Sequence, residues 1–224
     1  MRLLYINPNS TAQMTDGIAA IARATLPDVE VIGWTNAEGP PAIQGPEDGE
    51  AAVAGILRLL PAARDARADA IVIACFDDTG LAQMRDAAHC PVIGIGQAAY
   101  HAAALLGHRF SVVTTLAVSV PVIAGNIAAY GFARHCARVR ASGLGVLEVE
   151  AAGAPALRRL AEELAAAEAA DGITAAILGC AGMAPLRARL QAQSGLHLID
   201  GVASSAVLGM ALARIANRER PGLA

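Results

Sequence analysis

Short apolar runs alternate along the chain with longer segments in which apolar residues recur every three or four positions. The runs are bounded by Gly, Asp or Pro and are typical of buried parallel strands, whereas the longer segments have the periodicity of helices. This alternation predicts an α/β fold with mostly parallel sheets flanked by helices. We expect strands at 2–7, 29–34, 70–74, 91–95, 109–114, 133–140, 173–179 and 196–199. We expect helices at 9–26, 51–60, 80–89, 97–106, 119–130, 155–170, 183–193 and 201–217.

One part of this pattern occurs twice. Cys75 and Cys180 each follow an apolar run, and each is followed by small and polar residues and then a helical segment. Both cysteines should therefore lie at the carboxyl end of a buried strand, where open α/β sheets bind ligands. We also expect the N-terminus of the following helix to lower the pKa of each thiol.

The two cysteines are 105 residues apart, and other strand ends keep this offset. Asn9-Ser10 corresponds to Thr114-Thr115, and Ile95-Gly96 corresponds to Asp200-Gly201. A constant offset indicates an internal duplication that produces two pseudo-symmetric α/β lobes. We assign residues 1–97 plus 203–224 to the first lobe and residues 98–202 to the second. Each lobe should bring one cysteine to a cleft between them.

Two local patterns refine the first lobe. Ser10 and Gln13 have the spacing of a capping box at the start of the first helix. The segment 36–49 is rich in Pro and Gly and is long for a loop in a compact domain, which is typical of functional loops. We predict that it forms a flap over the cleft, with Ile43 and Gln44 in contact with the ligand.

Composition and charge exclude several classes of protein. The formal net charge of −3 gives no basic surface for nucleic acid. Apolar stretches are interrupted well before the ~20 residues that a membrane span needs, and the N-terminus lacks the pattern of a signal peptide. The four cysteines have no CxxC spacing, so we expect no metal site. We expect a cytoplasmic protein with reduced thiols, in which Cys90 and Cys136 are core residues.

Two facing thiols suit the inversion of a carbon acid next to a carbonyl group. One thiolate removes a proton from one face of the carbon while the other thiol returns a proton to the opposite face, so the sulfur atoms should lie roughly 7 Å apart. Asn9, Ser10, Thr114 and Thr115 are candidates to bind amide or carbonyl groups. We expect the backbone N–H groups of 76–78 and 181–183 to hold the developing enolate oxygen.

The chain resembles the hydantoin racemase family of the aspartate/glutamate racemase superfamily. The resemblance is carried by Asn7-Pro-Asn-Ser10, by Ala74-Cys-Phe-Asp-Asp78, by Val112-Val-Thr-Thr115 and by Ile177-Leu-Gly-Cys-Ala-Gly-Met183. It implies a homo-oligomeric racemase that needs neither cofactor nor metal and uses Cys75 and Cys180 as catalytic residues. The family commonly has proline after the two aspartates, where this chain has Thr79.

The residues next to the cysteines bear on the substrate. Amino-acid racemases of the superfamily have Asn-Thr after the first cysteine and Thr-His after the second, whereas this chain has Phe76-Asp77 and Ala181-Gly182. These residues suit a neutral cyclic ureide, either a 5-substituted hydantoin or allantoin. Three alternatives stay open: an isomerase or decarboxylase using one cysteine, a ureide-binding module without activity, and a thiol redox protein.

Overall fold

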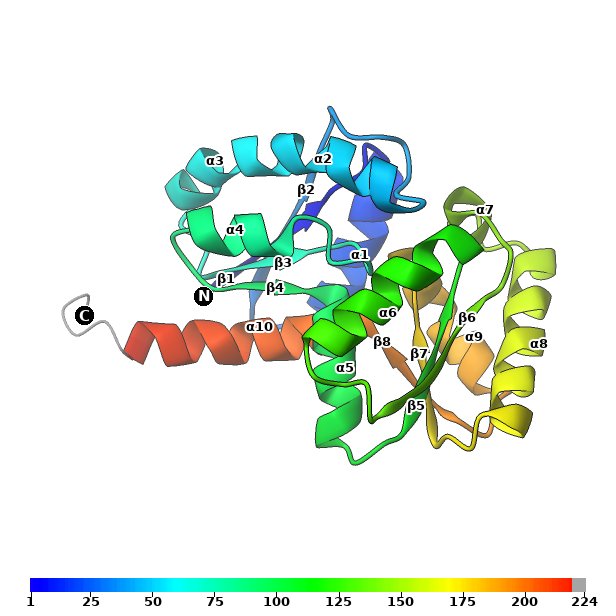
Figure 1. Ribbon diagram of the computed structural model, residues 1–224. Coiled ribbons are helices and arrows are strands. Elements are labelled where there is room, and N and C mark those ends of the chain that lie inside the picture. The colour runs from blue at the N-terminus through cyan, green and yellow to red at the C-terminus, as the bar shows by residue number, and fades with distance from the viewer. Residues whose placement is uncertain (219–224) are drawn as a thin grey trace.

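A computed structural model describes residues 1–218 and contains two four-stranded parallel sheets flanked by helices (Figure 1). The strand orders are β2-β1-β3-β4 and β6-β5-β7-β8, so the two sheets have the same topology. This confirms the predicted α/β fold with two similar lobes. The strands are β1 (Arg2–Asn7), β2 (Glu30–Thr35), β3 (Ala70–Ile73), β4 (Val92–Gly94), β5 (Phe110–Thr114), β6 (Cys136–Ala141), β7 (Ala175–Leu178) and β8 (His197–Asp200).

The helices lie close to their predicted positions, with differences at their ends. The α-helices are α1 (Ala12–Thr25), α2 (Pro46–Arg58), α3 (Leu60–Asp65), α4 (Leu81–Ala87), α5 (Ile95–Leu105), α6 (Val120–Ala129), α7 (Val146–Glu150), α8 (Ala154–Ala170), α9 (Arg187–Gln191) and α10 (Gly201–Arg218). Two short 3-10 helices, η1 (Ala117–Ser119) and η2 (Ala181–Leu186), precede α6 and α9.

Two local predictions were wrong, and one further short helix was not predicted. The N-cap of α1 is Thr11 rather than Ser10, and it has no side-chain hydrogen bond, so the predicted capping box is absent. The loop after β2 ends at Gly45 because Pro46 fits the first turn of α2. The connection 142–153 contains the short helix α7, whose Glu148 side chain accepts a hydrogen bond from the N–H of Gly145 at 2.7 Å.

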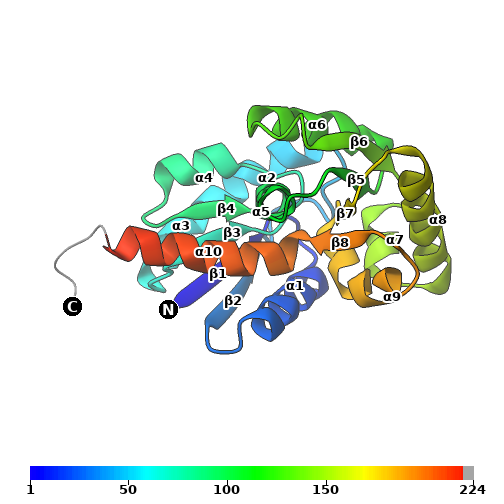
Figure 2. The same cartoon turned by 90° about the horizontal axis from the view of Figure 1, so that it is seen from below.

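Each lobe contributes a helix to the other. Helix α5 follows β4 of the first sheet but contacts β7 and β8 of the second, whereas α10 follows β8 and packs on β1, β3 and β4 (Figures 1 and 2). A Cβ on Gly209 of α10 would lie 3.2 Å from the Leu3 side chain, so this helix sits directly on the first sheet. The hydroxyl of Tyr5 in β1 donates to the carbonyl of Val202 in α10 at 3.0 Å.

The exchanged helices produce one core that runs through both lobes. It joins Tyr5 of the first sheet, Tyr100 of α5, and Phe110 and Ile177 of the second sheet, all of which are fully buried. Two smaller clusters lie on the outer faces of the sheets. Because the central core is continuous, it fixes the relative position of the two sheets and of the strand ends between them.

The first lobe was predicted to include residues 203–224, of which 219–224 lie outside the described residues. No helix within residues 1–218 is long and apolar enough to cross a membrane. The same described residues contain no group of three or more His, Cys, Asp or Glu side chains that would hold a metal ion.

Candidate active site

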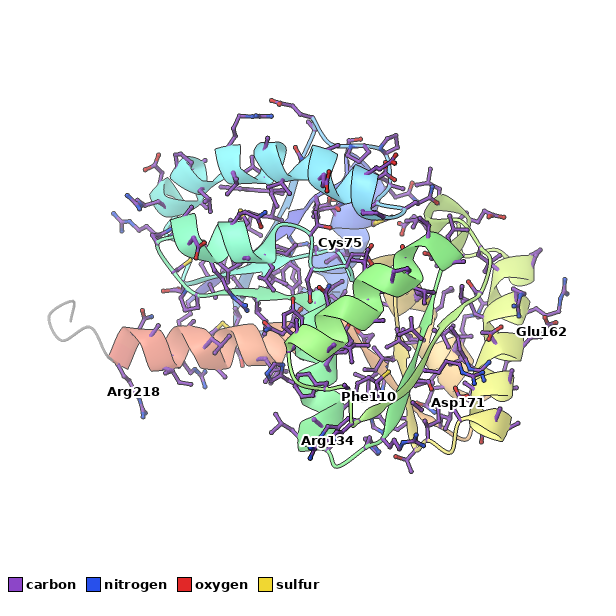
Figure 3. All side chains as sticks on the ribbon, viewed as in Figure 1. Cys75, Phe110, Arg134, Glu162, Asp171 and Arg218 are labelled. Atoms are coloured by element: carbon purple, nitrogen blue, oxygen red, sulfur yellow. The ribbon has the colours of Figure 1, made fainter. Side chains whose placement is uncertain are left out.

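Both cysteines of the duplicated pattern lie at the carboxyl ends of central strands. Cys75 follows β3 by two positions and Cys180 follows β7 by two positions, and both line one cavity. In Figure 3, Cys75 lies where the first lobe meets the second. The cavity is lined by Asn9, Met14, Ile43, Ala74, Cys75, Phe76, Asp77, Thr114, Thr115, Ser119, Val146, Gly179, Cys180 and Ala181.

Seven of the ten predicted substrate contacts line this cavity: Asn9, Ile43, Phe76, Asp77, Thr114, Thr115 and Ala181. The other three have structural roles beside it. The N–H of Ser10 donates to the carbonyl of Pro40 at 2.9 Å. Gln44 accepts a hydrogen bond from the N–H of Val146 at 3.0 Å. The N–H of Gly182 lowers the pKa of the Cys180 thiol.

The loop of residues 36–45, here called the 36–45 loop, connects the two lobes at the cavity. Its first-lobe end is held by Thr11, whose hydroxyl donates to the carbonyl of Pro41 at 2.7 Å. Its second-lobe end is held by the hydrogen bond between Gln44 and Val146, and between these anchors the buried side chain of Ile43 lines the cavity. The position of Ile43 agrees with the predicted flap, whereas Gln44 fastens the loop instead of lining the cavity.

The strand register changes both of the predicted correspondences between the lobes. Gly94 pairs with Ile73 and Asp200 pairs with Leu178, so Asp200 corresponds to Gly94 and not to Ile95. Ile6 pairs with Ile73, and Val113 pairs with Leu178, which is 105 residues after Ile73. Ile6 and Val113 are therefore equivalent, so the offset at β1 and β5 is 107 residues and the equivalent of Thr114 is Asn7, not Asn9. Asn9 still reaches the cavity because the chain turns after β1, where the N–H of Asn9 donates to the Asn7 side-chain oxygen at 3.2 Å.

Sequence reasoning missed five residues that line the cavity: Met14, Ala74, Ser119, Val146 and Gly179. The offset of 105 residues relates Met14 to Ser119 and Ala74 to Gly179, so the duplication contained a signal for four of them. Met14 lies in the first turn of α1, Ser119 immediately precedes α6, and both line the same cavity from opposite lobes. Val146 had no such signal, because its position depends on the 36–45 loop.

Burial controls the electrostatics of the two thiols. It raises the pKa of Cys75 far above the usual thiol range, and the negative charge of Asp77 raises it further. Burial likewise raises the pKa of Cys180 to about 12, against the lowering effect of the Gly182 N–H. The expectation that a helix N-terminus lowers these pKa values was wrong, because burial is the larger effect and α4 starts six residues after Cys75. The charge on Cys180 also raises the pKa of Cys75, so the two sulfurs interact.

The backbone N–H groups near the cysteines point mainly to the cysteines themselves. Those of Asp77, Gly182 and Met183 lower the pKa of the neighbouring thiol. These three are therefore placed to stabilise a thiolate. Those of Asp78 and Met183 donate to the carbonyl oxygens of Cys75 and Cys180, both at 3.0 Å. Because the N–H groups of Asp78 and Met183 already donate to backbone carbonyls, the prediction that they hold an enolate oxygen was wrong. For the other residues of 76–78 and 181–183 this role stays a prediction.

The two adjacent aspartates after Cys75 have different environments. Asp78 is buried with a positive φ of 51°, and its carboxylate accepts hydrogen bonds from the N–H groups of Gly96 and Gln97 at the start of α5. Asp77 lines the cavity, and burial raises its pKa to about 6. Asp78 is thus a structural residue of the lobe crossing, whereas Asp77 is available to a ligand.

The fold and the cavity define a two-lobed α/β protein in which matching strand ends bring two thiols to one site. Such a site presents two ionisable side chains to a ligand, each from a different half of the chain. The chain belongs to the Asp/Glu/Hydantoin racemase family, whose model matches residues 3–209. It is therefore an isomerase of the racemase class.

Individual relatives resemble the chain over most of its length. A hydantoin racemase from Rhizobium meliloti is 43% identical over 215 residues, which cover 95% of this chain and 88% of that protein. The solved structure of an allantoin racemase from Klebsiella pneumoniae is 37% identical with a TM-score of 0.91, covering 96% of this chain and 89% of the other. An allantoin racemase from Pseudomonas fluorescens has the same TM-score at 33% identity, covering 96% and 92%.

Proposed function

We propose that this racemase inverts C5 of 5-substituted hydantoins, with Cys75 and Cys180 as the two proton-transfer residues and without a cofactor. The observation that carries the proposal is the position of the two thiols, which line one cavity from equivalent strand ends of opposite lobes. A planar intermediate between them would meet one thiol on each face. The 43% identity to a hydantoin racemase supports a hydantoin as the substrate.

The charge of the cavity supports a neutral substrate. No Lys or Arg is among the described residues that line it, and Asp77 is the carboxylate that does. An amino acid would bring an ammonium group that can pair with Asp77, but also a carboxylate for which the lining side chains offer no cation, and a buried unpaired carboxylate is unfavourable. A cyclic ureide has no such charge.

The proton transfers balance in a single cycle. Taking Cys75 as the base, its thiolate removes the C5 proton, and the electron pair of the C–H bond moves into the adjacent carbonyl group to form an enolate. The Cys180 thiol then gives its proton to the opposite face of C5, and the enolate electrons return to form the new C–H bond. The enzyme is left with a Cys75 thiol and a Cys180 thiolate, which is the form that acts on the opposite enantiomer.

A polarimetric assay tests this proposal. Enantiopure benzylhydantoin and isopropylhydantoin should lose optical rotation in the presence of the protein, and C5 should take up deuterium in heavy water. Faster decay on (S)-allantoin than on either hydantoin would identify allantoin as the substrate. Binding of the ring without loss of rotation would mean that the protein only binds ureides, and product formation with loss of CO₂ would indicate a decarboxylase.

Two further properties belong to this proposal. Free thiols at Cys75, Cys136 and Cys180 suit a reducing compartment such as the cytoplasm. Exposed apolar side chains on α10, including Val207 and Ile215, and on the end of α5 at Leu105 support assembly into a homo-oligomer. Sedimentation equilibrium measures the oligomeric state, and a monomer at assay concentrations would contradict that part of the proposal.

A further inference from the structure

The polar residues that line the cavity already make hydrogen bonds within the protein. These bonds determine whether each residue presents a donor or an acceptor to a ligand. The side-chain oxygen of Asn9 accepts from the N–H of Thr11 and from the side-chain amide of Asn7, both at 2.9 Å. This network sets the orientation of the Asn9 amide, and its NH₂ group faces the weak acceptor sulfur of Met14 at 3.3 Å. Asn9 therefore presents a donor to the cavity.

Thr114 presents the opposite polarity. Its hydroxyl donates to the carbonyl of Gly179 at 3.0 Å, which uses its single proton. The lone pairs of the same oxygen remain, so a ligand that meets Thr114 must bring a donor.

Asp77 presents a stronger and less satisfied acceptor. The Ser119 side chain acts on its carboxylate to lower the pKa, and the side-chain amide of Asn126 donates to its backbone carbonyl at 2.8 Å. These contacts from the second lobe hold the residue in place. Its Oδ2 atom, however, is buried without a hydrogen-bond partner among the described residues. A buried carboxylate oxygen without a donor is costly, so this position favours a ligand that supplies one.

We propose that Oδ2 of Asp77 accepts a hydrogen bond from a ring N–H of the cyclic ureide and so makes that N–H a requirement for binding. The inference rests on the proposed function and adds the feature by which the substrate is selected. A cyclic ureide alternates carbonyl and N–H groups around its ring, which matches a site where Asn9 donates while Asp77 and Thr114 accept. Rings in which a methyl group replaces the N–H proton lack the donor that Asp77 needs.

The experiment compares a 5-substituted hydantoin with its N1-methyl and N3-methyl derivatives. The kcat/KM of racemisation is measured on all three for the wild type and for Asp77→Leu, which keeps bulk at the position but has no acceptor. At least one methyl group should lower kcat/KM of the wild type by about 30-fold or more, since a site built to bind an N–H rejects ligands that lack it. In Asp77→Leu the same methyl group should cost less than about threefold. Methylation also changes the intrinsic acidity of C5, but this effect is the same in both proteins. It therefore cancels when the methyl effect in the wild type is compared with that in Asp77→Leu.

Asp78→Asn is the matched control, because it changes the neighbouring carboxylate, which binds the start of α5 and does not line the cavity. It should lower the stability of the protein. The ratio of kcat/KM between methylated and unmethylated substrates should stay the same as in the wild type. An equal methyl penalty in the wild type and Asp77→Leu would overturn the inference and leave the proposed function intact.

A binding measurement separates the inference from turnover. The unmethylated hydantoin should raise the Tm of the wild type more than the methylated ring does, and this difference should disappear in Asp77→Leu. If these Tm differences were seen but no hydantoin were racemised, the proposed function would be refuted and the inference supported. A hydantoin that is neither racemised nor raises Tm would refute both.

Discussion

Gly201, the first residue of α10, lies against the carbonyl oxygen of Ile95, the first residue of α5, so closely that a Cβ would come within 2.4 Å of that oxygen. Ile95 and Gly201 are equivalent positions of the two halves, because they follow Gly94 and Asp200, which pair with the equivalent residues Ile73 and Leu178. The chain passes from one lobe to the other at both positions. The contact therefore marks the point where the two halves cross.

Gly201→Ala should destabilise the protein by about 2 kcal/mol or more, because the backbone at the crossing must shift to admit the methyl group. Urea denaturation measures the change as a lower midpoint. Gly125→Ala is the control: Gly125 lies within α6 with open space around its Cβ position. This change should raise stability by about 0.5–1 kcal/mol. A midpoint for Gly201→Ala equal to that of the wild type would show that the crossing is not tightly packed.

Cys75→Ser and Cys180→Ser should each lower racemisation more than about 100-fold in both directions, because inversion needs one group on each face. The remaining thiol should still exchange the C5 proton of one enantiomer with deuterium from solvent. Proton NMR in heavy water, started from each pure enantiomer, would then show which cysteine serves which enantiomer.

Cys136→Ser is the control for this pair, because Cys136 lies in β6 and does not line the cavity. It should keep racemisation near the wild-type rate. If either cavity variant retained wild-type racemisation, its cysteine would not be a proton-transfer residue.

Asp77→Asn should make both cavity thiols more reactive. Burial is the largest cause of the raised pKa of Cys75 and of Cys180, and the charge of Asp77 adds to it in both cases. Removing this negative charge lowers both pKa values, so a larger fraction of each thiol is ionised at any pH below its pKa. The rate of inactivation by iodoacetamide between about pH 7 and 9 should therefore rise several-fold. Asp78→Asn should leave the rate near that of the wild type, and equal rates in wild type and Asp77→Asn would contradict the electrostatic argument.

Gln44→Ala should weaken substrate binding without a large loss of stability. The variant loses the acceptor for the Val146 N–H, and a net hydrogen bond contributes about 1 kcal/mol, which is roughly fivefold in an equilibrium. The 36–45 loop would be held less firmly over the cavity, and KM should rise by about that factor. Gln44→Glu keeps an acceptor oxygen and should restore most of the binding. An unchanged KM in Gln44→Ala would show that the loop does not close the site.

The fold could be predicted well from the sequence because both halves contain the same local patterns. The apolar strands and the glycines after them are short-range features, and the spacing of Cys75 and Cys180 shows that these features repeat. The same topology in both sheets follows from repeating them. The relation between Met14 and Ser119 was also present in the offset, but neither residue type suggests a binding site by itself.

Other features depend on contacts between distant segments. The hydrogen bond between Gln44 and Val146 joins residues 102 positions apart, and no pattern in either segment indicates it. The sequence also gave no measure of burial, so the pKa values of the thiols were expected to move in the wrong direction. The two aspartates after Cys75 look alike in the sequence, yet one binds the start of α5 and the other lines the cavity.

The exchange of α5 and α10 means that the chain cannot be cut into two separately stable fragments. A fragment ending near residue 200 would leave the apolar face of the first sheet without the helix that covers it. The two similar halves thus form one cooperative folding unit. The distance between the sulfur atoms of Cys75 and Cys180 depends on how this whole unit packs.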